Sequence, residues 1–208
     1  MAAVFKTQLA QSCSAGYLTG DACLARCYEV LGEMLRYRGY ENVSFTCANS
    51  LELDGCMETD GVVAVATEGS REDKAVVFLA ESRVGVKSLR AVAESNAGTQ
   101  TAVMVVSIEG PTSFAKRDLS AAGVEFITFK QIFNDIAKHR LVPPHRRISC
   151  PDEQKAVAHR FCIGAPSQWP KLLLSDPMSV FGDFREGDII EIRRKCVSGE
   201  NIYYRRVG

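Results

Sequence analysis

Long apolar runs are missing from this sequence of 208 residues, and so is an excess of charge of either sign. The segment 1–20 contains one lysine and no apolar stretch long enough for a signal peptide or a membrane span. We therefore expect a protein without a membrane anchor that stays inside the cell. Apolar residues make up 46% and charged residues 24% of the chain, values that exclude a disordered protein and favour a folded globular one.

The charges balance overall but are unevenly distributed. Up to Lys138 there are 13 basic and 17 acidic residues, and after it 12 basic and 8 acidic ones. A protein that binds nucleic acid unaided usually carries a basic excess, because phosphate neutralisation supplies most of its affinity. The sequence therefore predicts that any DNA contact is local and depends on a partner that holds this protein in place.

Sites for cofactors are also scarce. No Gly-rich phosphate-binding loop of either common type occurs, so nucleotide binding has no support. The eight cysteines include no Cys-x-x-Cys pair, and the tightest pair, Cys23 and Cys27, has helical spacing. We expect free thiols packed as small apolar side chains, with no metal and no other cofactor.

The front of the chain shows a helix followed by alternating strands and helices. Segment 21–39 has apolar residues at helical spacing, with Asp21 as the N-cap and Gly39 as the stop, whereas residues 41–60 show no clear period. Apolar runs typical of strands covered on both faces follow at 62–66, 75–80, 102–108 and 124–128, with helical patterns between them. We predict an α/β N-terminal domain with a mixed sheet.

The segment Leu141–His145, LVPPH, ends this rhythm because two prolines prevent a continued helix. We place the domain boundary here, giving an N-terminal domain at 1–138 and a C-terminal domain at 139–208. Short helices are expected after Cys150 and after Asp176, and the end of the chain is typical of a β-hairpin with its turn around 198–201. The C-terminal domain is predicted to be small and α+β.

The predicted hairpin carries many cations. Arg193, Arg194 and Lys195 on one strand would lie opposite Arg205 and Arg206 on the other. Such a group is usually a solvated face, but charged C-terminal hairpins also pair with larger partners.

Two sets of residues could carry catalysis. Asp60 with Glu72 and Lys74 resembles the carboxylates and lysine of metal-dependent nucleases, although the polar stretch around 72–74 is more typical of a solvated turn. Cys150 with His145 and His159 could form a thiolate and base pair, but a cysteine at a helix N-terminus is more often structural.

The remaining histidine, His139, lies with His145 on either side of the two prolines. The two could form a metal pair, but hydrogen bonding that fixes the interdomain linker is the role we favour.

The tail of the chain resembles the shared fifth subunit of eukaryotic RNA polymerases and its archaeal H-subunit counterpart. The order and spacing of its motifs carry the resemblance: His139–His145, Pro151 followed by acids at 152 and 153, Trp169–Leu172, Asp176–Pro177, Arg185–Ile192 and Tyr204–Val207. The front domain resembles the eukaryotic members less tightly, at Arg38–Tyr40, Arg83–Lys87 and Ala102–Ser107. Because the archaeal H subunit is the tail domain alone, the front domain points to a eukaryotic or eukaryote-derived version.

The sequence departs from the family pattern at two places. The family has an arginine where Val180 stands, and its glycine is displaced to Gly182. The family's Thr-Pro-Ser-Ala-Lys loop becomes Pro111–Lys116, with proline and threonine exchanged and Phe114 inserted. These differences suggest a distant lineage, a virus-encoded copy or a specialised paralogue.

The resemblance implies a non-catalytic subunit of a multisubunit DNA-directed RNA polymerase in the nucleus. Its front domain would be a jaw near downstream duplex DNA, and its tail would dock on the largest subunit and contact other polymerase subunits. The expected contacts to the DNA backbone are Pro111, Thr112, Ser113, Lys116 and Arg117, because a helix N-terminus binds phosphate well. An ordinary capped helix is the alternative for this loop.

For docking, the tail hairpin with Ile189, Ile190, Ile192, Ile202 and Tyr203 is the expected surface. The residues predicted for docking are His139, Pro143, His145, Asp176, Pro177, Gly187, Ile190, Ile192, Tyr204 and Arg205. A metal-dependent nuclease and an adaptor outside transcription remain as alternative functions.

Overall fold

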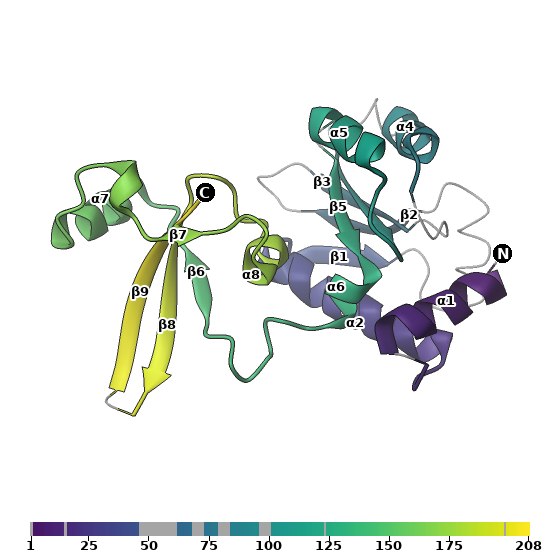
Figure 1. Cartoon of the computed structure of the whole chain (residues 1–208), viewed down its shortest axis with the longest axis horizontal. Coiled ribbons are helices and arrows are strands. Elements are labelled where there is room, and N and C mark those ends of the chain that lie inside the picture. Colours follow the sequence, from purple (N-terminus) through teal and green to yellow (C-terminus); the bar gives the residue numbers. More distant parts are fainter. Residues whose placement is uncertain are drawn as a thin grey trace. The chain divides into compact units, whose positions relative to one another are not determined.

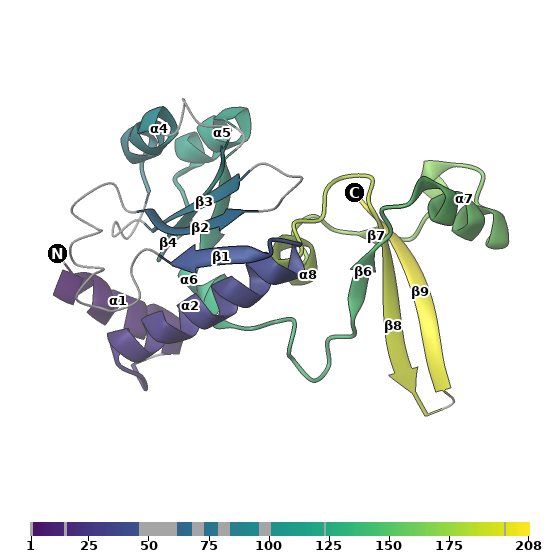
Figure 2. The ribbon, with the colours of Figure 1, turned by 180° about the vertical axis from the view of Figure 1, so that it is seen from behind.

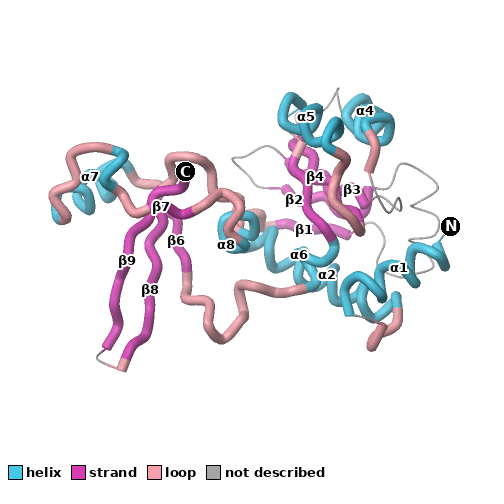
Figure 3. Tube along the Cα trace, viewed as in Figure 1, coloured by secondary structure: helices cyan, strands magenta, loops and turns pink. Residues whose placement is uncertain are grey.

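The computed structural model describes residues 2–14, 16–45, 62–67, 73–78, 84–95, 101–122, 124–197 and 199–208. The chain divides into two compact units, Met1–Asn134 and Asp135–Gly208, and each unit has its own sheet (Figures 1 and 3). None of the helices described is long and apolar enough to cross a bilayer.

The N-terminal unit is built on a sheet of five strands in sequence order: β1 (Asn42–Phe45), β2 (Val62–Thr67), β3 (Asp73–Phe78), β4 (Thr101–Ser107) and β5 (Glu125–Thr128). The first three strands pair antiparallel, and β3, β4 and β5 pair parallel. This arrangement confirms the predicted mixed sheet. Strand β1 lies in the segment that showed no period, and β3 begins at Asp73, earlier than the apolar run predicted.

Helices lie on both sides of this sheet (Figures 1 and 2). One side carries α4 (Val86–Ser95) and α5 (Ser113–Ala122), and the other carries α1 (Ala2–Ser14), α2 (Gly20–Tyr37) and α6 (Phe129–Phe133). Strand β4 shows why both faces are covered. Val103 and Val105 form a buried cluster with Ala115 of α5, and the alternation of a strand turns Met104 and Val106, also buried, to the other face.

Helix α1 was not predicted, and it gains its stability from packing. Phe5 and Leu9 are fully buried, and the ring of Phe5 meets that of Phe129 edge-on at 5.5 Å. The prediction that Asp21 caps the next helix is wrong, since the hydroxyl of Thr19 is the N-cap and accepts from the N–H of Ala22.

A buried ion pair joins the end of α2 to β5. The Arg38 side chain is 2% exposed, and its guanidinium donates two hydrogen bonds to the Glu125 carboxylate, at 2.9 and 2.7 Å. Removal of one member of such a buried pair is strongly destabilising, because it leaves an uncompensated charge. Arg38 therefore fixes where α2 ends relative to the sheet.

The C-terminal unit is a sheet with the strand order β6 (His145–Arg147), β8 (Ile189–Cys196), β9 (Gly199–Val207) and β7 (Lys171–Leu172). Strands β8 and β9 form the predicted hairpin, and β7 pairs with the end of β9 in parallel. The helices are α7 (Pro151–Arg160), a 3₁₀ turn η1 (Pro166–Gln168) and α8 (Pro177–Phe181). Together these elements confirm a small α+β unit.

The hairpin register corrects the expected grouping of cations. The loop joins Cys196 to Gly199, earlier in the chain than predicted, so Arg193 faces Ile202 and Arg194 faces Asn201. Arg205 and Arg206 face Ile190 and Ile189 instead, near the base of the hairpin. The two groups of cations therefore lie at opposite ends of β8 and β9.

Two glycines shape the chain between α8 and β8. Gly187 has a φ of +95°, a left-handed conformation that glycine adopts without strain, and lies in the turn that leads into β8. Gly182 follows α8, where an added Cβ would lie 2.5 Å from Cε1 of the buried Phe184 ring. The lack of a side chain at Gly182 is thus a packing requirement.

We expect Gly182→Ala to destabilise the C-terminal unit by about 1–3 kcal/mol, because the new methyl overpacks the Phe184 site. Denaturation followed by fluorescence of Trp169 measures this unit alone, since Trp169 is the single tryptophan and is buried there. Gly164→Ala is the matched control, with its nearest neighbour at 3.8 Å, and should change stability by less than about 0.5 kcal/mol. Equal unfolding midpoints for the two variants would contradict the packing argument.

Candidate functional site

A groove of about 350 Å³ in the C-terminal unit brings most of the predicted docking residues together. Six of the ten line it: Pro143, His145, Asp176, Pro177, Ile192 and Arg205. They come from the linker before β6, from the start of α8 and from both hairpin strands. Three separate stretches of sequence therefore contribute to one surface.

His145 occupies the start of β6 within this groove. Its Nδ1 donates to the carbonyl oxygen of Pro143 at 2.7 Å. Burial lowers the pKa of His145 below its usual value, and the charges of Arg194 and Arg205 act in the same direction, against the opposite effects of the Pro143 hydrogen bond and Asp176. The imidazole is therefore neutral at neutral pH.

The linker histidines fix the backbone between them. His139 Nδ1 accepts a hydrogen bond from the N–H of Leu141 at 3.3 Å, and His145 bonds Pro143. Both histidines thus make local hydrogen bonds to the backbone of residues 139–145, as the favoured interpretation requires. Across the residues that the structure describes, no group of three His, Cys, Asp or Glu side chains is arranged to hold a metal ion.

The other predicted docking residues lie outside this groove. His139 is exposed on the linker, and Gly187 forms the turn before β8. Ile190 is fully buried, and Tyr204 packs its ring against Phe161 at 5.6 Å. The positions of Gly187, Ile190 and Tyr204 indicate structural roles. His139 is the most accessible of the four residues.

The expected apolar docking surface on the hairpin needs correction. Ile189, Ile190 and Ile192 are 7%, 0% and 2% exposed and belong to the core of the unit itself. Ile202 and Tyr203 are exposed, at 44% and 46%, and the guanidinium of Arg194 lies 5.2 Å from the centre of the Tyr203 ring. The outer half of the hairpin is therefore its most exposed part, while Arg205 near the base stays accessible from the groove.

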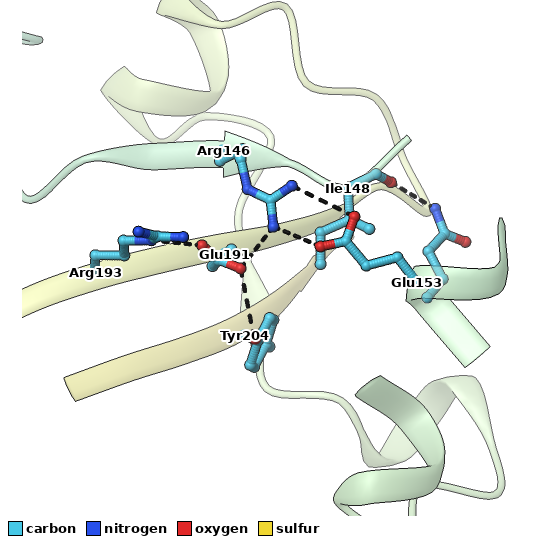
Figure 4. A network of polar contacts seen from close by, with 7 residues as sticks. Arg146, Ile148, Glu153, Glu191, Arg193 and Tyr204 are labelled. Carbon is cyan, nitrogen blue, oxygen red and sulfur yellow. Dashed lines mark hydrogen bonds and ion pairs between the residues drawn. The ribbon is translucent and has the colours of Figure 1, made fainter. Parts of the chain in front are cut away.

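Glu191 holds the base of the hairpin to its neighbours (Figure 4). Its carboxylate is 4% exposed and accepts from Arg146 of β6 at 2.8 Å, from Arg193 at 2.7 Å and from the Tyr204 hydroxyl at 3.5 Å. Arg146 also reaches Glu153 of α7 at 2.5 Å. One buried carboxylate thus connects β6, β8 and β9 and, through Arg146, α7.

The hydrogen bond from Arg146 is the largest influence on the pKa of Glu191 and lowers it, and Arg193 acts in the same direction against burial. Glu191 is therefore ionised at neutral pH. The sequence pattern did not single out Glu191, although a carboxylate between isoleucines on a buried strand is a signal that it must have cationic partners.

The residues predicted to contact DNA lie at the start of α5. The Thr112 hydroxyl accepts from the N–H of Ala115 at 3.3 Å, so Thr112 caps the helix. Pro111 is half-buried, whereas Ser113, Lys116 and Arg117 are exposed, as is Phe114 at 74%. The arrangement is a capped helix that also presents two cations one turn further on.

The structure does not test the nuclease alternative, because Asp60 and Glu72 lie outside the described residues. The expected solvated turn is wrong for Asp73 and Lys74, which begin strand β3. Cys150 precedes α7 without a side-chain capping bond. Cys23 and Cys27 are fully buried in α2, as expected for cysteines packed as small apolar residues, whereas Cys150, Cys162 and Cys196 are exposed, so the expectation is wrong for these three.

The C-terminal unit matches a known protein family. Residues 134–207 match the family described as RNA polymerase Rpb5, C-terminal domain. The DNA-directed RNA polymerase subunit Rpo5 of Pyrococcus abyssi is 44% identical over 78 residues, which cover 92% of that protein and 38% of this chain. The chain belongs to the Rpb5/Rpo5 family.

Similarity to a eukaryotic member of this family extends into the N-terminal unit. The DNA-directed RNA polymerases I, II, and III subunit RPABC1 of Caenorhabditis elegans is 26% identical over 157 residues, which cover 72% of this chain and 73% of that protein. The Rpo5 subunit of Methanococcus vannielii again matches only 35% of this chain, at 37% identity. The aligned length is thus about twice as long for the eukaryotic relative as for the archaeal ones.

The structure shows where the two departures from the family pattern near α8, Val180 and Gly182, lie. Val180, at the expected arginine position, is half-buried in α8. Gly182 is held by its packing against Phe184, and the carbonyl oxygens of Gly182 and Asp183 accept from the guanidinium of Arg147. The chain after α8 is therefore fixed by its own contacts.

We expect Glu191→Gln to destabilise the C-terminal unit at neutral pH by about 1.5–3 kcal/mol, because the hydrogen bonds from Arg146 and Arg193 lose their charge assistance. A carboxyl whose pKa is lower in the folded state than in the unfolded state stabilises the fold at any pH above its unfolded-state pKa. This stabilisation is lost as the pH falls through the folded-state pKa. The difference in the free energy of unfolding between Glu191→Gln and the wild type should therefore become smaller as the pH falls below the usual glutamate pKa of about 4.3. Denaturation followed by Trp169 fluorescence across pH measures this narrowing.

Glu153→Gln is the matched control for this measurement. Its carboxylate also bonds Arg146 but is 38% exposed, so its loss should cost less than about 1 kcal/mol. A stability difference for Glu191→Gln that stays constant with pH would show that Glu191 does not titrate as argued.

Proposed function

We propose that this protein is a structural subunit of a multisubunit DNA-directed RNA polymerase with no catalytic site of its own. The observation that carries the proposal is the match of the C-terminal unit to 92% of the length of Rpo5, a protein named as a polymerase subunit. The partners are other polymerase subunits. Since RPABC1 is named as a subunit of polymerases I, II and III, the protein acts in the nucleus.

The C-terminal unit docks on the largest polymerase subunit through the groove lined by Pro143, His145, Asp176, Pro177, Ile192 and Arg205. Its support is the convergence of these separate motifs on one concave surface. Its lining combines apolar side chains with the charged groups of Asp176, Arg194 and Arg205, and polar groups of this kind fix the orientation of a partner on an apolar surface. The positions 1–138 and 139–208 then correspond to a jaw domain and an assembly domain.

The N-terminal unit contacts the backbone of downstream duplex DNA through Pro111, Thr112, Ser113, Lys116 and Arg117. The N-terminus of α5 supports this, because backbone N–H groups and the helix dipole favour phosphate there, and Lys116 and Arg117 are exposed on the next turn. Such contacts position a protein without reading sequence. Their number is small, so docking must hold this unit near the DNA.

We expect a tagged copy of the chain, expressed in its source cells, to recover the large polymerase subunits at roughly equal stoichiometry. Arg205→Glu should lower that recovery by about tenfold or more, because it reverses a cation at the edge of the docking groove. Lys155→Glu on α7, 80% exposed and outside the groove, is the control and should recover the wild-type amount. Quantitative mass spectrometry of the purified complexes gives the ratio.

Recovery of the wild-type chain as a monomer, or with proteins outside transcription, would overturn the proposed function. Equal recovery by Arg205→Glu and the wild type would overturn the assignment of the groove alone.

We expect replacement of Lys116 and Arg117 by alanine to weaken binding of the purified polymerase to downstream duplex DNA. Each lost phosphate contact should reduce the slope of log affinity against log salt concentration by about 0.9. Fluorescence anisotropy of a labelled duplex over a salt series measures that slope. Lys130→Ala, an exposed lysine of α6, is the control, and an unchanged slope in the double variant would leave α5 as a capped helix only.

A further inference from the structure

The outer part of β8 has an open edge. Strand β6 covers only Ile190–Ile192 on that side, and the last bond of the pairing runs from the N–H of Arg193 to the carbonyl oxygen of Pro144. In an antiparallel strand, residues two apart direct their N–H and C=O groups to the same side. The peptide groups of Lys195 therefore point to the side on which Arg193 bonds Pro144. On the β9 side Lys195 is paired with Glu200, and within the described chain none of the backbone hydrogen bonds outside the strand ladders reaches its N–H or C=O.

The chain before β6 diverges from β8 and leaves a second groove beside this edge. This basic groove has a volume of about 630 Å³ and lies between Arg140–Pro144 and Arg193–Cys196. It is separate from the floor of the docking groove around α8, but the two share Leu141, Val142, Pro143 and Arg194. A chain that follows the open edge would therefore pass over both.

The basic groove is strongly positive. Its lining contains Arg140, Arg193, Arg194 and Lys195 against a single acid, Glu200. Arg193 is occupied by Glu191 at 2.7 Å. Across the residues that the structure describes, neither Arg140 nor Arg194 nor Lys195 forms an ion pair. Among the residues described, Arg140 and Lys195 thus have no carboxylate partner, and Arg194, which lies over the Tyr203 ring, has none either.

An apolar wall accompanies these cations. Leu141 is 74% exposed, and Val142 and Pro143 continue the wall. Phosphate groups gain nothing from such a wall, whereas a peptide can place carboxylates on the cations and an apolar side chain on Leu141. Charge and apolar surface together favour protein over nucleic acid.

We propose that the basic groove binds an extended acidic segment of another polymerase subunit, which adds as a short strand to the edge of β8 at Lys195. Main-chain hydrogen bonds to Lys195 give the segment its direction, and Arg140, Arg194 and Lys195 select its carboxylates. An apolar residue of the segment covers Leu141. This inference rests on the proposed function, since it names the chemistry of one partner in the assembly.

A photoreactive residue at Leu141 tests the proposal in the assembled polymerase. The tagged chain carries p-benzoyl-phenylalanine in place of Leu141, the complex is purified, irradiated and digested, and the crosslinked peptide is identified by mass spectrometry. We expect the crosslink in a segment of another subunit in which acidic residues outnumber basic ones. The double variant Arg140→Glu/Lys195→Glu should lower the crosslink yield by about tenfold or more, because each reversed charge repels the segment.

The control is Lys155→Glu/Arg160→Glu, which reverses two exposed cations of α7 and should keep the wild-type yield. Trp169 fluorescence of both double variants checks that the C-terminal unit remains folded. A crosslink to nucleic acid, to a neutral or basic segment, or to nothing in an assembled complex would overturn the inference, as would an unchanged yield in Arg140→Glu/Lys195→Glu. A wild-type chain that recovers no polymerase would overturn the proposed function as well, so the two failures are distinguishable.

Discussion

The C-terminal unit depends on the ionised carboxylate of Glu191. A buried carboxylate is stable only when cations and hydrogen bonds surround it, and here they come from β6, β8 and β9. Because β6 is three residues long, its few ladder bonds hold it on β8 only weakly. The contact of Arg146 with Glu191 adds the interaction that keeps β6 in register, and Glu153 extends the same connection to α7.

The position of β6 determines both surfaces for which we propose partners. The linker leads into β6 at His145. Because β6 is held on β8, Pro143 and His145 are held where they line the docking groove. The same entry point makes the linker diverge from β8 beyond Arg193, which opens the basic groove. Strand β8 consequently has two parts: Ile189–Ile192 are buried, and Arg193–Cys196 are exposed. One strand supplies the core at its base and a charged edge at its tip.

The sequence predicted the sheet of the N-terminal unit well, because continuous apolar runs such as 102–108 report burial on both faces. It did not predict α1 or β1, whose residues are stabilised by contacts such as Phe5 with Phe129 that no local pattern records. The hairpin was predicted but its register was wrong, since a small shift of the turn moves every cross-strand partner. The expectation that Ile190 and Ile192 lie at a partner surface was wrong for a different reason. The sequence of a strand does not show which of its apolar side chains are buried within the unit itself.

Six of the residues predicted for docking are separated in sequence and meet in the fold, so their convergence does not depend on the hairpin register. Pro143, Asp176 and Arg205 belong to three stretches that no periodicity connects, yet all line one groove. The basic groove was missed because its cations come from the linker and from one strand, and only the divergence of the linker from β8 separates them from a solvated face. A cation held on a strand whose base is fixed by Glu191 loses less conformational freedom on binding than one on a loop, so the tip of β8 is preorganised for a partner.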